Sequence, residues 1–355
     1  MDRPTAHLNA VATAVPRHDV HEAFIGWAEQ RIGEPRARAL FRRMADRCGI
    51  GHRWSVLAET PGGGSPVSPG GYYASDPLPP TSARMALYAE EAPRLALEAV
   101  AGLGELGAIS HLVVASCTGF VAPGIDQIIA AALGLGGAVE RTLIGFMGCY
   151  AAVAALRTAH HIVRSEPGAR VLVVTVELSS LHLQPENEIA PLLSMLQFGD
   201  GAAAAIVTAE PSGLALDRFF AATLPDSAAL IRWSIGDTGF AMHLSGEVPG
   251  RIGRALADPD FTRTLIGGGG VEAVDAWAVH AGGRSILDAV EQALHLPAEA
   301  LAASREVLRA NGNMSSSTLM FVLAALLKKP DARNGVAVAF GPGLAAEGFG
   351  FRRAA

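Results

Sequence analysis

The chain has 355 residues, more than a typical single domain, which predicts two domains or two fused halves. Half of its residues are hydrophobic, and 28 Lys and Arg stand against 34 Asp and Glu, for a formal net charge of −6. No basic block with interleaved aromatic residues occurs, which argues against nucleic acid as a main partner. Three cysteines, Cys48, Cys117 and Cys149, have no framework spacing and indicate a reducing compartment without a disulfide scaffold.

The N-terminal segment predicts no export or membrane anchoring. The first twenty residues lack the charged, apolar and cleavage regions of a secretory signal peptide. The uncharged apolar runs fall short of the roughly 18 residues that a membrane-spanning helix requires. We therefore expect a cytoplasmic protein with no stable membrane insertion.

The first part of the chain alternates apolar strand-like segments with helical segments. Near-continuous apolar strands between helices are typical of a parallel-rich sheet that is covered on both faces. Pro93 is expected to break or restart the third helix, and residues 60–80, rich in Pro, Gly and Ser, form a loop. The expected strands cover residues 7–15, 110–116, 169–177 and 202–208, and the expected helices cover 20–32, 36–47, 81–102 and 126–133.

Pro211-Ser212-Gly213 marks a boundary between an N-terminal half, 1–210, and a C-terminal half, 211–355. The second half is expected to contain strands at 275–280 and 335–340, a strand end at 308–310, and helices at 285–294 and 315–328. FGDGAAAAIV in the first half and GVAVAFGPG in the second hint at an internal duplication.

Residues 141–156, RTLIGFMGCYAAVAAL, predict a strand, a tight turn and a helix that runs to about residue 165, with Cys149 at the helix N-terminus. The unpaired N–H groups and positive dipole end of a helix N-terminus favour a thiolate, so Cys149 is a candidate nucleophile. A buried core cysteine is the alternative, because most free cysteines are buried.

Two further residues follow the same kind of turn before a helix. His280 precedes Ala281-Gly282-Gly283, and Asn313 lies in Asn311-Gly312-Asn313-Met314-Ser315. Chemistry in open α/β sheets collects at the carboxyl ends of strands. A histidine there can pair with Cys149 as thiolate and imidazolium, and an asparagine amide can donate to an oxyanion. Taken singly, His280 can also be a structural histidine and Asn313 a turn residue.

Two other groups of residues have less specific interpretations. Residues 36–53 carry Arg36, Arg38, Arg42, Arg43, Arg47 and Arg53, which form either a solvated helix face or a docking site for an anionic ligand such as a nucleotide phosphate. His160-His161 is interpreted as ordinary helix surface and packing, since no CxxC, HExxH or carboxylate cluster completes a metal site.

The segments around the three candidate residues occur in a specific order from about residue 5 to about 352. They are FMGCYA at 146–151, LQFGDGAAA at 196–204, WAVHAGGRSILDAVE at 277–291, NGNMSSST at 311–318 and AFGPGLAAEGF at 339–349. With them the chain resembles the type III polyketide synthases, the chalcone and stilbene synthase family of thiolase-fold condensing enzymes. HAGGRSIL, NGNMSSST and FGPG separate this family from ketoacyl-ACP synthase III and the thiolases.

The resemblance implies an α/β, five-layered αβαβα fold made of two similar βαβαβαββ halves, and a homodimer. It implies that Cys149 accepts a starter acyl group from acyl-CoA and that malonyl-CoA then loses CO2. His280 and Asn313 would stabilise the resulting enolate, which attacks the acyl group on Cys149 before further rounds and cyclisation. Acyl-CoA and malonyl-CoA are substrates, and no cofactor or metal is implied.

The resemblance also assigns residues around this centre. Phe198 matches the gatekeeping aromatic residue between the CoA tunnel and the cavity, and Ser315 follows the catalytic asparagine. The CoA-binding residues would be Arg47, Arg53, Gly282 and Ser285. The cavity would also be lined by Cys117, Thr118, Ala122, His182, Trp233 and Met242.

The cavity residues differ from those of plant chalcone-forming enzymes, and RWSIGDTGFAMHL at 232–244 resembles bacterial alkylresorcinol and alkylpyrone synthases. We therefore expect a fatty acyl-CoA starter and a resorcinol or pyrone product. The alternatives are a ketoacyl-ACP-synthase-III-like enzyme, a cysteine-dependent acyl-CoA hydrolase and a non-catalytic acyl-binding protein.

Overall fold

The computed structural model describes residues 4–354 and contains one nine-stranded sheet made of two groups of strands. The strand order is β11-β12-β13-β8-β1-β7-β6-β4-β5. Each half of the chain supplies one group, and the two groups meet where Leu8 of β1 lies opposite Leu214 of β8. The described chain contains no helix with the length and apolar character needed to cross a membrane.

The first half has the order β-α-β-α-β-α-β-β that the resemblance implies. Its sheet strands are β1 (His7–Ala14), β4 (His111–Ser116), β5 (Glu140–Gly145), β6 (Val171–Leu178) and β7 (Asp200–Thr208). Its helices are α1 (His21–Arg31), α2 (Pro35–Ala45), α3 (Thr81–Ala101), α4 (Ile125–Ala132), α5 (Ala151–Ser165) and α6 (Ile189–Met195). The short strands β2 (His18–Asp19) and β3 (Trp54–Ser55) pair beside α1, and one-turn 3₁₀ helices cover Gly148–Tyr150 and Ser179–His182.

The second half repeats this plan with one strand fewer, since a helix stands where the first half has β5. Its sheet strands are β8 (Leu214–Thr223), β11 (Ala276–Val279), β12 (Asn334–Gly341) and β13 (Ala345–Arg353). Its helices are α7 (Val248–Ala257), α8 (Pro259–Ile266), α9 (Arg284–Ala293), α10 (Ala302–Asn311) and α11 (Ser316–Leu327). A separate hairpin of β9 (Ile231–Gly236) and β10 (Gly239–Leu244) lies next to α6, and short 3₁₀ turns cover Val271–Ala273 and Pro342–Leu344.

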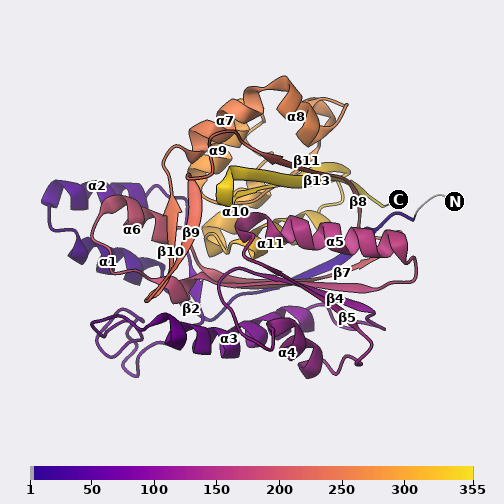
Figure 1. Ribbon diagram of the computed structural model, residues 1–355. Coiled ribbons are helices and arrows are strands. Elements are labelled where there is room, and N and C mark those ends of the chain that lie inside the picture. Colours follow the sequence, from indigo (N-terminus) through magenta and orange to yellow (C-terminus); the bar gives the residue numbers. More distant parts are fainter. Residues whose placement is uncertain (1–3, 355) are drawn as a thin grey trace.

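The helices and strands form five layers. Figure 1 shows α5 and α11 between the two groups of strands, with α3 and α4 on one outer side and α7 and α8 on the other. Successive residues of β4 point alternately to the two sides: Val113 packs in the central cluster with α5 and α11, whereas Leu112 and Val114 pack in the outer one. This alternation explains why the strands are apolar throughout.

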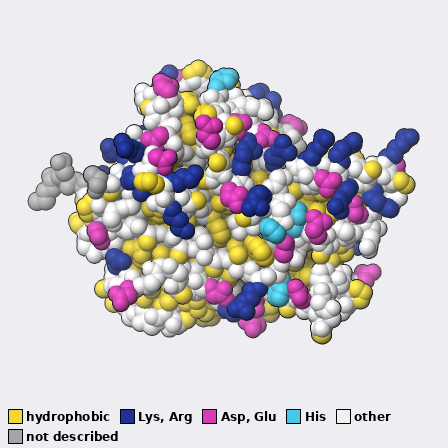
Figure 2. Space-filling model, turned by 180° about the vertical axis from the view of Figure 1, so that it is seen from behind, with side chains coloured by type: hydrophobic (Ala, Val, Ile, Leu, Met, Phe, Trp, Pro, Cys, Tyr) yellow, Lys and Arg dark blue, Asp and Glu magenta, His cyan; other side chains and the backbone are white. Residues whose placement is uncertain are grey.

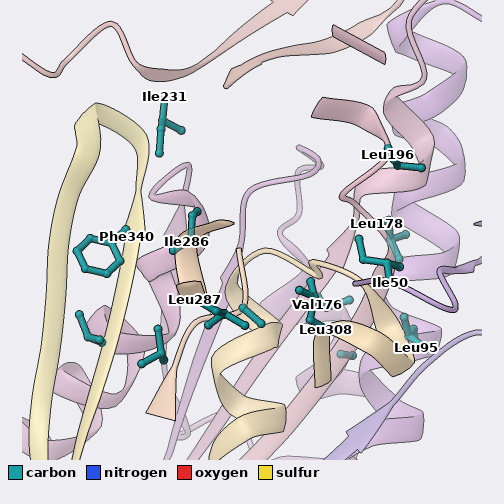
Figure 3. Packing of buried hydrophobic residues seen from close by; sticks show 14 of the residues in the cluster. Ile50, Leu95, Val176, Leu178, Leu196, Ile231, Ile286, Leu287, Leu308 and Phe340 are labelled. Carbon is teal, nitrogen blue, oxygen red and sulfur yellow. The ribbon is translucent and has the colours of Figure 1, made fainter. Parts of the chain in front are cut away.

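The outer cluster contains residues of both halves. Figure 3 shows Leu95 of α3 and Val176 and Leu178 of β6 in the same cluster as Leu287 of α9 and Phe340 of β12. The ends of β4, β6 and β11 therefore meet in one packed region, and the side chains that follow these strands come together there.

Three expectations about the elements need correction. The sheet is mixed rather than parallel-rich, because β6–β7, β12–β13 and the strands joining the two halves pair antiparallel. Helix α3 continues through Pro93. Burial of its apolar face on the sheet offsets the free-energy cost of the backbone hydrogen bond that proline cannot donate. Residues 308–310 belong to helix α10, so Asn313 follows a helix and not a strand.

Residues 214–266 contain β8, the β9–β10 hairpin, α7 and α8, none of which the sequence pattern predicted. Outside this region α6, β13 and the short strands β2 and β3 were not predicted either. The other expected strands and helices agree with the observed ranges to within a few residues. The fold is thus the α/β thiolase-like arrangement, with a shortened second half.

Candidate active site

Cys149 lies in a tight turn between β5 and α5. Phe146 and Gly148 both have positive φ, 59° and 70°, a region that favours glycine and strains other residues. A Cβ atom on Gly148 would lie 2.6 Å from Cδ of Pro342, so the turn packs directly on the Gly341-Pro342-Gly343 loop of the second half. The turn fixes Cys149 at the N-terminal end of α5 and ties it to the opposite half.

Burial decides the protonation of the Cys149 thiol. Loss of hydration raises the pKa of Cys149 to about 12, hydrogen bonds from Ser315 and Asn313 act against that rise, and the Glu177 carboxyl adds to it. The N-terminal position on α5 favours a thiolate, but here the cost of burying a charge is larger. The resting cysteine is therefore a neutral thiol until another group takes its proton.

His280 directly follows β11, and its backbone N–H continues the ladder to Val338 at 2.8 Å. Its imidazole is buried, and neither ring nitrogen has a hydrogen-bond partner among the described residues. Burial lowers the pKa of His280 to about 3, so the ring is neutral. Buried polar atoms are normally paired, and unpaired ones often mark functional sites. Burial favours the neutral form of both Cys149 and His280, so the expected thiolate–imidazolium pair stays a prediction.

The Asn313 side chain is held in one orientation by its neighbours. Its Oδ1 accepts hydrogen bonds from Ser315 N at 2.8 Å and from Thr318 Oγ1 at 3.4 Å, and its Nδ2 donates to Gly282 O at 3.2 Å. Asn313 also lowers the pKa of Cys149, which indicates that its amide lies close to the thiol. Asn313 is therefore a preorganised donor that links the His280 loop to Cys149.

A β-bridge joins Asn313 to Phe198. Asn313 N donates to Gln197 O at 2.8 Å, and Gly199 N donates to Asn313 O at 3.0 Å. Gly199 is required here, because a Cβ atom would lie 2.9 Å from Asn311 O. Two motifs more than 100 residues apart, FGDG and NGNM, thus form a single structural unit.

Glu177 is a buried carboxyl group beside this site that sequence reasoning missed. It follows the apolar run of β6, and its oxygens accept hydrogen bonds from Cys117 N at 3.0 Å, Thr118 Oγ1 at 2.9 Å and Ser316 Oγ. Burial raises the pKa of Glu177, despite these hydrogen bonds. The sequence carried a signal, since Glu177 is the one acidic residue in the near-continuous apolar run 171–178.

Cys117 and Ser315 complete the network around Glu177. The Cys117 Sγ atom lies 3.3 Å from Ser315 Oγ and 3.3 Å from Glu177 Oε1. Ser315 has a positive φ of 47°, a strained conformation for a serine, and hydrogen-bonds Cys149 as well. The structure therefore brings Cys117 and Ser315 to the Cys149 site, as expected from the resemblance.

Thr118 and His182 connect the end of β4 to its neighbours. The Thr118 hydroxyl donates to Glu177 and accepts from Leu178 N at 2.8 Å, so its hydrogen bonds are made within the protein. His182 Nε2 donates to Thr118 O at 2.7 Å, and its Nδ1 accepts from Phe240 N at 3.1 Å. This tautomer is neutral, and burial lowers the pKa of His182 to about 4. His182 thus fixes the β9–β10 hairpin against the end of β4.

A mostly apolar cavity lies between α1, α6 and the β9–β10 hairpin. Its volume is about 110 Å³, and its lining includes Phe198, His182, Trp233 and Met242. Trp233 and Met242 lie opposite each other in the hairpin ladder. The cavity shares Val20, Ala23 and residues 65–67 with a more open hollow of about 520 Å³ between α1 and the 59–69 loop.

Arg53 holds the backbone of the Phe198 loop. Its side chain is buried, with Nη1 donating to Phe198 O at 2.9 Å and Met195 O at 3.1 Å, and Nε donating to His21 Nδ1 at 3.0 Å. Its Nη2 has no hydrogen-bond partner among the described residues, and Arg53 lines the apolar cavity. Its expected contact with CoA stays a prediction.

Of the other expected CoA contacts, Arg47 and Ser285 are exposed at the surface, whereas Gly282 is buried and accepts the Asn313 hydrogen bond. The Arg47 carbonyl accepts from Arg284 Nη1 at 3.2 Å, which brings the end of α2 next to the start of α9. Ala122, expected in the cavity, is solvent-exposed and follows β4 in a surface loop. It lines neither cavity described above.

One group of potential metal ligands lies at the opposite end of the strands from Cys149. His111, Glu140 and Glu166 have ligand atoms within 4.8 Å of one another, at the beginnings of β4 and β5 and the end of α5. Cys149 follows the opposite end of β5, so this group takes no part in the site described here.

Comparisons with known proteins agree with this geometry. Residues 2–211 match the family model of the N-terminal domain of chalcone and stilbene synthases, and residues 216–354 match the model of the C-terminal domain. The chain belongs to the chalcone and stilbene synthase family. These type III polyketide synthases are acyltransferases that catalyse condensations, and the chain is an enzyme of this class.

Individual relatives are similar over most of the chain. The type III polyketide synthase-like protein Pks18 of Mycobacterium tuberculosis, described by its name as an alpha-pyrone synthesis enzyme, is 36% identical over 76% of this chain and 72% of its own length. Bisdemethoxycurcumin synthase of rice is 35% identical over 86% and 80% of the two chains. The crystal structure of PKS-I from the brown alga Ectocarpus siliculosus superposes with a TM-score of 0.90 at 31% identity, covering 99% of both chains.

Proposed function

We propose that this enzyme extends a fatty acyl starter, bound to Cys149 as a thioester, by iterative decarboxylative condensation with malonyl-CoA. The observation that carries the proposal is the pair of unpaired nitrogens on buried, neutral His280, next to Gly282, whose carbonyl accepts from the oriented Asn313 amide. A neutral imidazole and a neutral amide are suitable donors to an oxyanion, and a substrate carbonyl oxygen would give the orphaned histidine a partner.

Each step uses these three groups. In loading, the Cys149 sulfur attacks the starter thioester carbonyl, the carbon–sulfur bond to CoA breaks, and the cysteine proton passes through His280 to the departing CoA thiolate. In extension, the carbon–carbon bond of malonyl-CoA breaks, CO2 leaves, and the electron pair forms an enolate whose oxygen is held by His280 and Asn313. The enolate carbon then attacks the Cys149 thioester, and Cys149 leaves as the thiolate.

Glu177 is compatible with this chemistry if it is protonated. A carboxylate next to an enolate would oppose it, but burial raises the pKa of Glu177 and favours its neutral form. The raised pKa of Glu177 thus reduces the negative charge that would oppose the enolate.

The apolar cavity supports a fatty rather than a polar starter. Its lining brings apolar side chains from α1, α6 and β10 next to Phe198. It shares lining residues with the hollow between α1 and the 59–69 loop, which supports a route for a longer chain. Pks18, whose name describes alpha-pyrone synthesis, is 36% identical over 76% of this chain, so an alkylpyrone or alkylresorcinol-type product is proposed.

The test is mass spectrometry of products formed from malonyl-CoA and a panel of acyl-CoA starters from C2 to C20, without carrier protein. We expect pyrone or resorcinol products with long starters, and none from the Cys149→Ala variant. Strict dependence on a carrier protein for malonyl delivery would favour a ketoacyl-synthase-III-like enzyme. Release of the free starter acid without malonate-dependent products would favour an acyl-CoA hydrolase.

We also propose a homodimer that forms along β5. This strand lies at one end of the sheet with both faces exposed, and Phe120, Leu143 and Phe146 are exposed large apolar residues on and beside it. An edge strand with exposed apolar side chains invites pairing with another chain, here a second copy.

Light scattering with size-exclusion chromatography tests the dimer. We expect a dimer for the wild type and a monomer for Leu143→Lys, because a buried charge in the proposed interface has no partner. The control is Ile235→Lys, another exposed apolar position, on β9, that should leave the dimer intact. A monomeric wild type, or a dimer unaffected by Leu143→Lys, contradicts the interface.

A further inference from the structure

Three side chains with potential ligand atoms meet at the end of the first half that lies opposite Cys149. His111 begins β4, Glu140 begins β5, and Glu166 is the C-terminal cap of α5. His111 and Glu140 lie opposite each other in the parallel ladder. Because side chains alternate along a strand, His111 points to the same side as Val113, which packs in the central cluster with α5. We call His111, Glu140 and Glu166 the His111 cluster.

The His111 ring presents a lone pair to both carboxylates. The residue is only 6% exposed, and its Nδ1 lies 2.9 Å from Ser110 Oγ. This hydroxyl accepts from Arg170 N at 3.0 Å and donates to Arg170 O at 3.3 Å, so the ring supplies the hydrogen between Nδ1 and Oγ. Nε2 makes no hydrogen bond among the described residues. It lies 3.8 Å from Glu140 Oε2 and 3.9 Å from Glu166 Oε2, too far for a hydrogen bond.

Negative charge collects at the His111 cluster without a basic side chain from Lys or Arg. Within residues 4–354 no Lys or Arg nitrogen lies within 4.0 Å of either carboxylate. Glu166 stands at the C-terminal end of α5, where the helix dipole is also negative and disfavours an acid. Figure 1 shows that α5 ends on the side where the chain termini lie, and Figure 2 shows dark-blue Lys and Arg side chains gathered mainly toward the other side. The arrangement favours a bound cation.

We propose that the His111 cluster binds a divalent transition-metal ion of the zinc class. Zn²⁺ takes histidine nitrogen and glutamate oxygen at about 2.0–2.2 Å, so two bonds through one ion reach across about 4 Å. The ring nitrogen lies 3.8 and 3.9 Å from the two carboxylate oxygens, which matches this span. Ca²⁺ and Mg²⁺ prefer oxygen ligands alone, and the cluster contains no thiol for a softer ion. Water completes the coordination, because Glu140 and Glu166 are exposed.

The hydrogen bond to Ser110 orients the histidine ligand. A metal-bound histidine almost always donates its other ring N–H to a fixed acceptor, and Ser110 Oγ is held by the backbone of residue 170. The ion would tie the starts of β4 and β5 to the end of α5. Helix α5 has 15 residues and is about 22 Å long, so the ion lies far from Cys149. Its role is to stabilise the folded first half, which is independent of the proposed function.

The test is calorimetric titration of Zn²⁺ into enzyme that has been treated with a chelator and freed of it. The variants are Glu140→Gln and Glu166→Gln, which keep the size of two exposed side chains and remove one charge each. We expect a single Zn²⁺ site per chain, with affinity lowered about tenfold or more in each variant, since even loss of a group behind a ligand costs that much. Glu299→Gln, at an exposed acid of the second half, is the matched control and should bind like the wild type.

Two further measurements identify the ligands and the effect of the ion. Zn²⁺ should raise the Tm of the wild type and leave that of Glu140→Gln/Glu166→Gln unchanged. Co²⁺ in the same site should show d–d absorption without a sulfur-to-cobalt charge-transfer band, because its ligands are nitrogen and oxygen.

The opposite results overturn the metal site. Zn²⁺ binding that neither variant weakens places the ion elsewhere, and a sulfur-to-cobalt band assigns it to a cysteine. If the wild type binds no Zn²⁺, His111 is an imidazolium that pairs with the two acids, and the proposal fails. Polyketide formation by both variants should equal that of the wild type, so failure of the metal site leaves the proposed function standing. An inactive wild type that binds Zn²⁺ at the cluster rejects the proposed function alone.

Discussion

At the scale of single residues, burial sets the chemistry of the site. It keeps Cys149 as a thiol and His280 as a neutral imidazole, and it raises the pKa of Glu177. Neutral donors such as His280 and Asn313 need little reorganisation when an oxyanion forms. Asn313 shows the principle most directly, since three neighbours fix its orientation before any substrate arrives.

Asn313→Ala should separate the two half-reactions. Removing one oxyanion donor is expected to slow malonyl-CoA decarboxylation roughly 10²–10³-fold, since such donors act mainly in the transition state. Loading of Cys149 with a labelled starter should change much less. Radiolabelled CO2 release and acyl-enzyme formation measure the two steps, and an equal loss in both would count against the oxyanion role.

The residues that could be predicted from the sequence are those that belong to contiguous motifs. Cys149, His280 and Asn313 each lie in a tight turn before a helix, and Asn313 lies near enough to Cys149 to lower its pKa. Glu177 was missed because a single acid in an apolar strand predicts nothing until its contacts are known. The burial of Arg53 could not be predicted because a buried and an exposed arginine look the same in a sequence, and only its bonds to Phe198 and Met195 distinguish them.

At the scale of elements, turns hold the site together. Gly148 joins the Cys149 turn to Pro342, and Gly199 lets Phe198 pair with Asn313. The sequence predicted most helices from periodicity and capping, but it could not predict strand direction. Direction depends on which strands become neighbours, and the last two strands of each half return antiparallel without a crossover helix. Helix α10 was mistaken for a strand end because only three of its residues, 308–310, were considered.

Gly148→Ala tests the role of the turn. The substitution places a Cβ atom against Pro342 at a positive φ, so we expect a loss of about 1–3 kcal/mol in the free energy of unfolding and a large loss of Cys149 acylation. Gly145→Ala is the matched control, because nothing lies within 4 Å of its Cβ position. Urea denaturation and acyl-enzyme mass spectrometry measure both effects. Similar behaviour of the two variants would show that the turn tolerates a side chain.

At the scale of the whole molecule, buried histidines couple stability to pH. Burial lowers the pKa of His21, His160 and His182 to about 4, and that of His280 to about 3. Unfolding returns each ring to its ordinary pKa near 6.5, so the unfolded chain binds more protons than the folded one between about pH 6.5 and 4. The free energy of unfolding therefore falls on acidification through this range.

Urea denaturation between pH 7 and 5 measures this dependence. A pH of 5.5 is one unit below the pKa of histidine in the unfolded chain. At this pH, buried His182 and His280 should each lower the free energy of unfolding by about 1.4 kcal/mol. Asp200 and Glu177, whose pKa values are raised, act in the opposite direction, but they are two groups against four. His160→Gln should flatten the curve, and His243→Gln, at an exposed position, should not. Stability that is constant or increases down to pH 5 would refute the coupling.

The division of the site between the two halves has a consequence for the chain during its synthesis. Cys149 leaves the ribosome 131 residues before His280 and still longer before Asn313 and Ser315. At about 5–20 residues per second, the interval to His280 is roughly 7–26 s. In that interval α11, which packs on the Gly148–Tyr150 turn, is not yet present, so the nascent protein exposes this cysteine more than the finished fold does. The growing chain is therefore most open to oxidants and stray thioesters before its catalytic site exists.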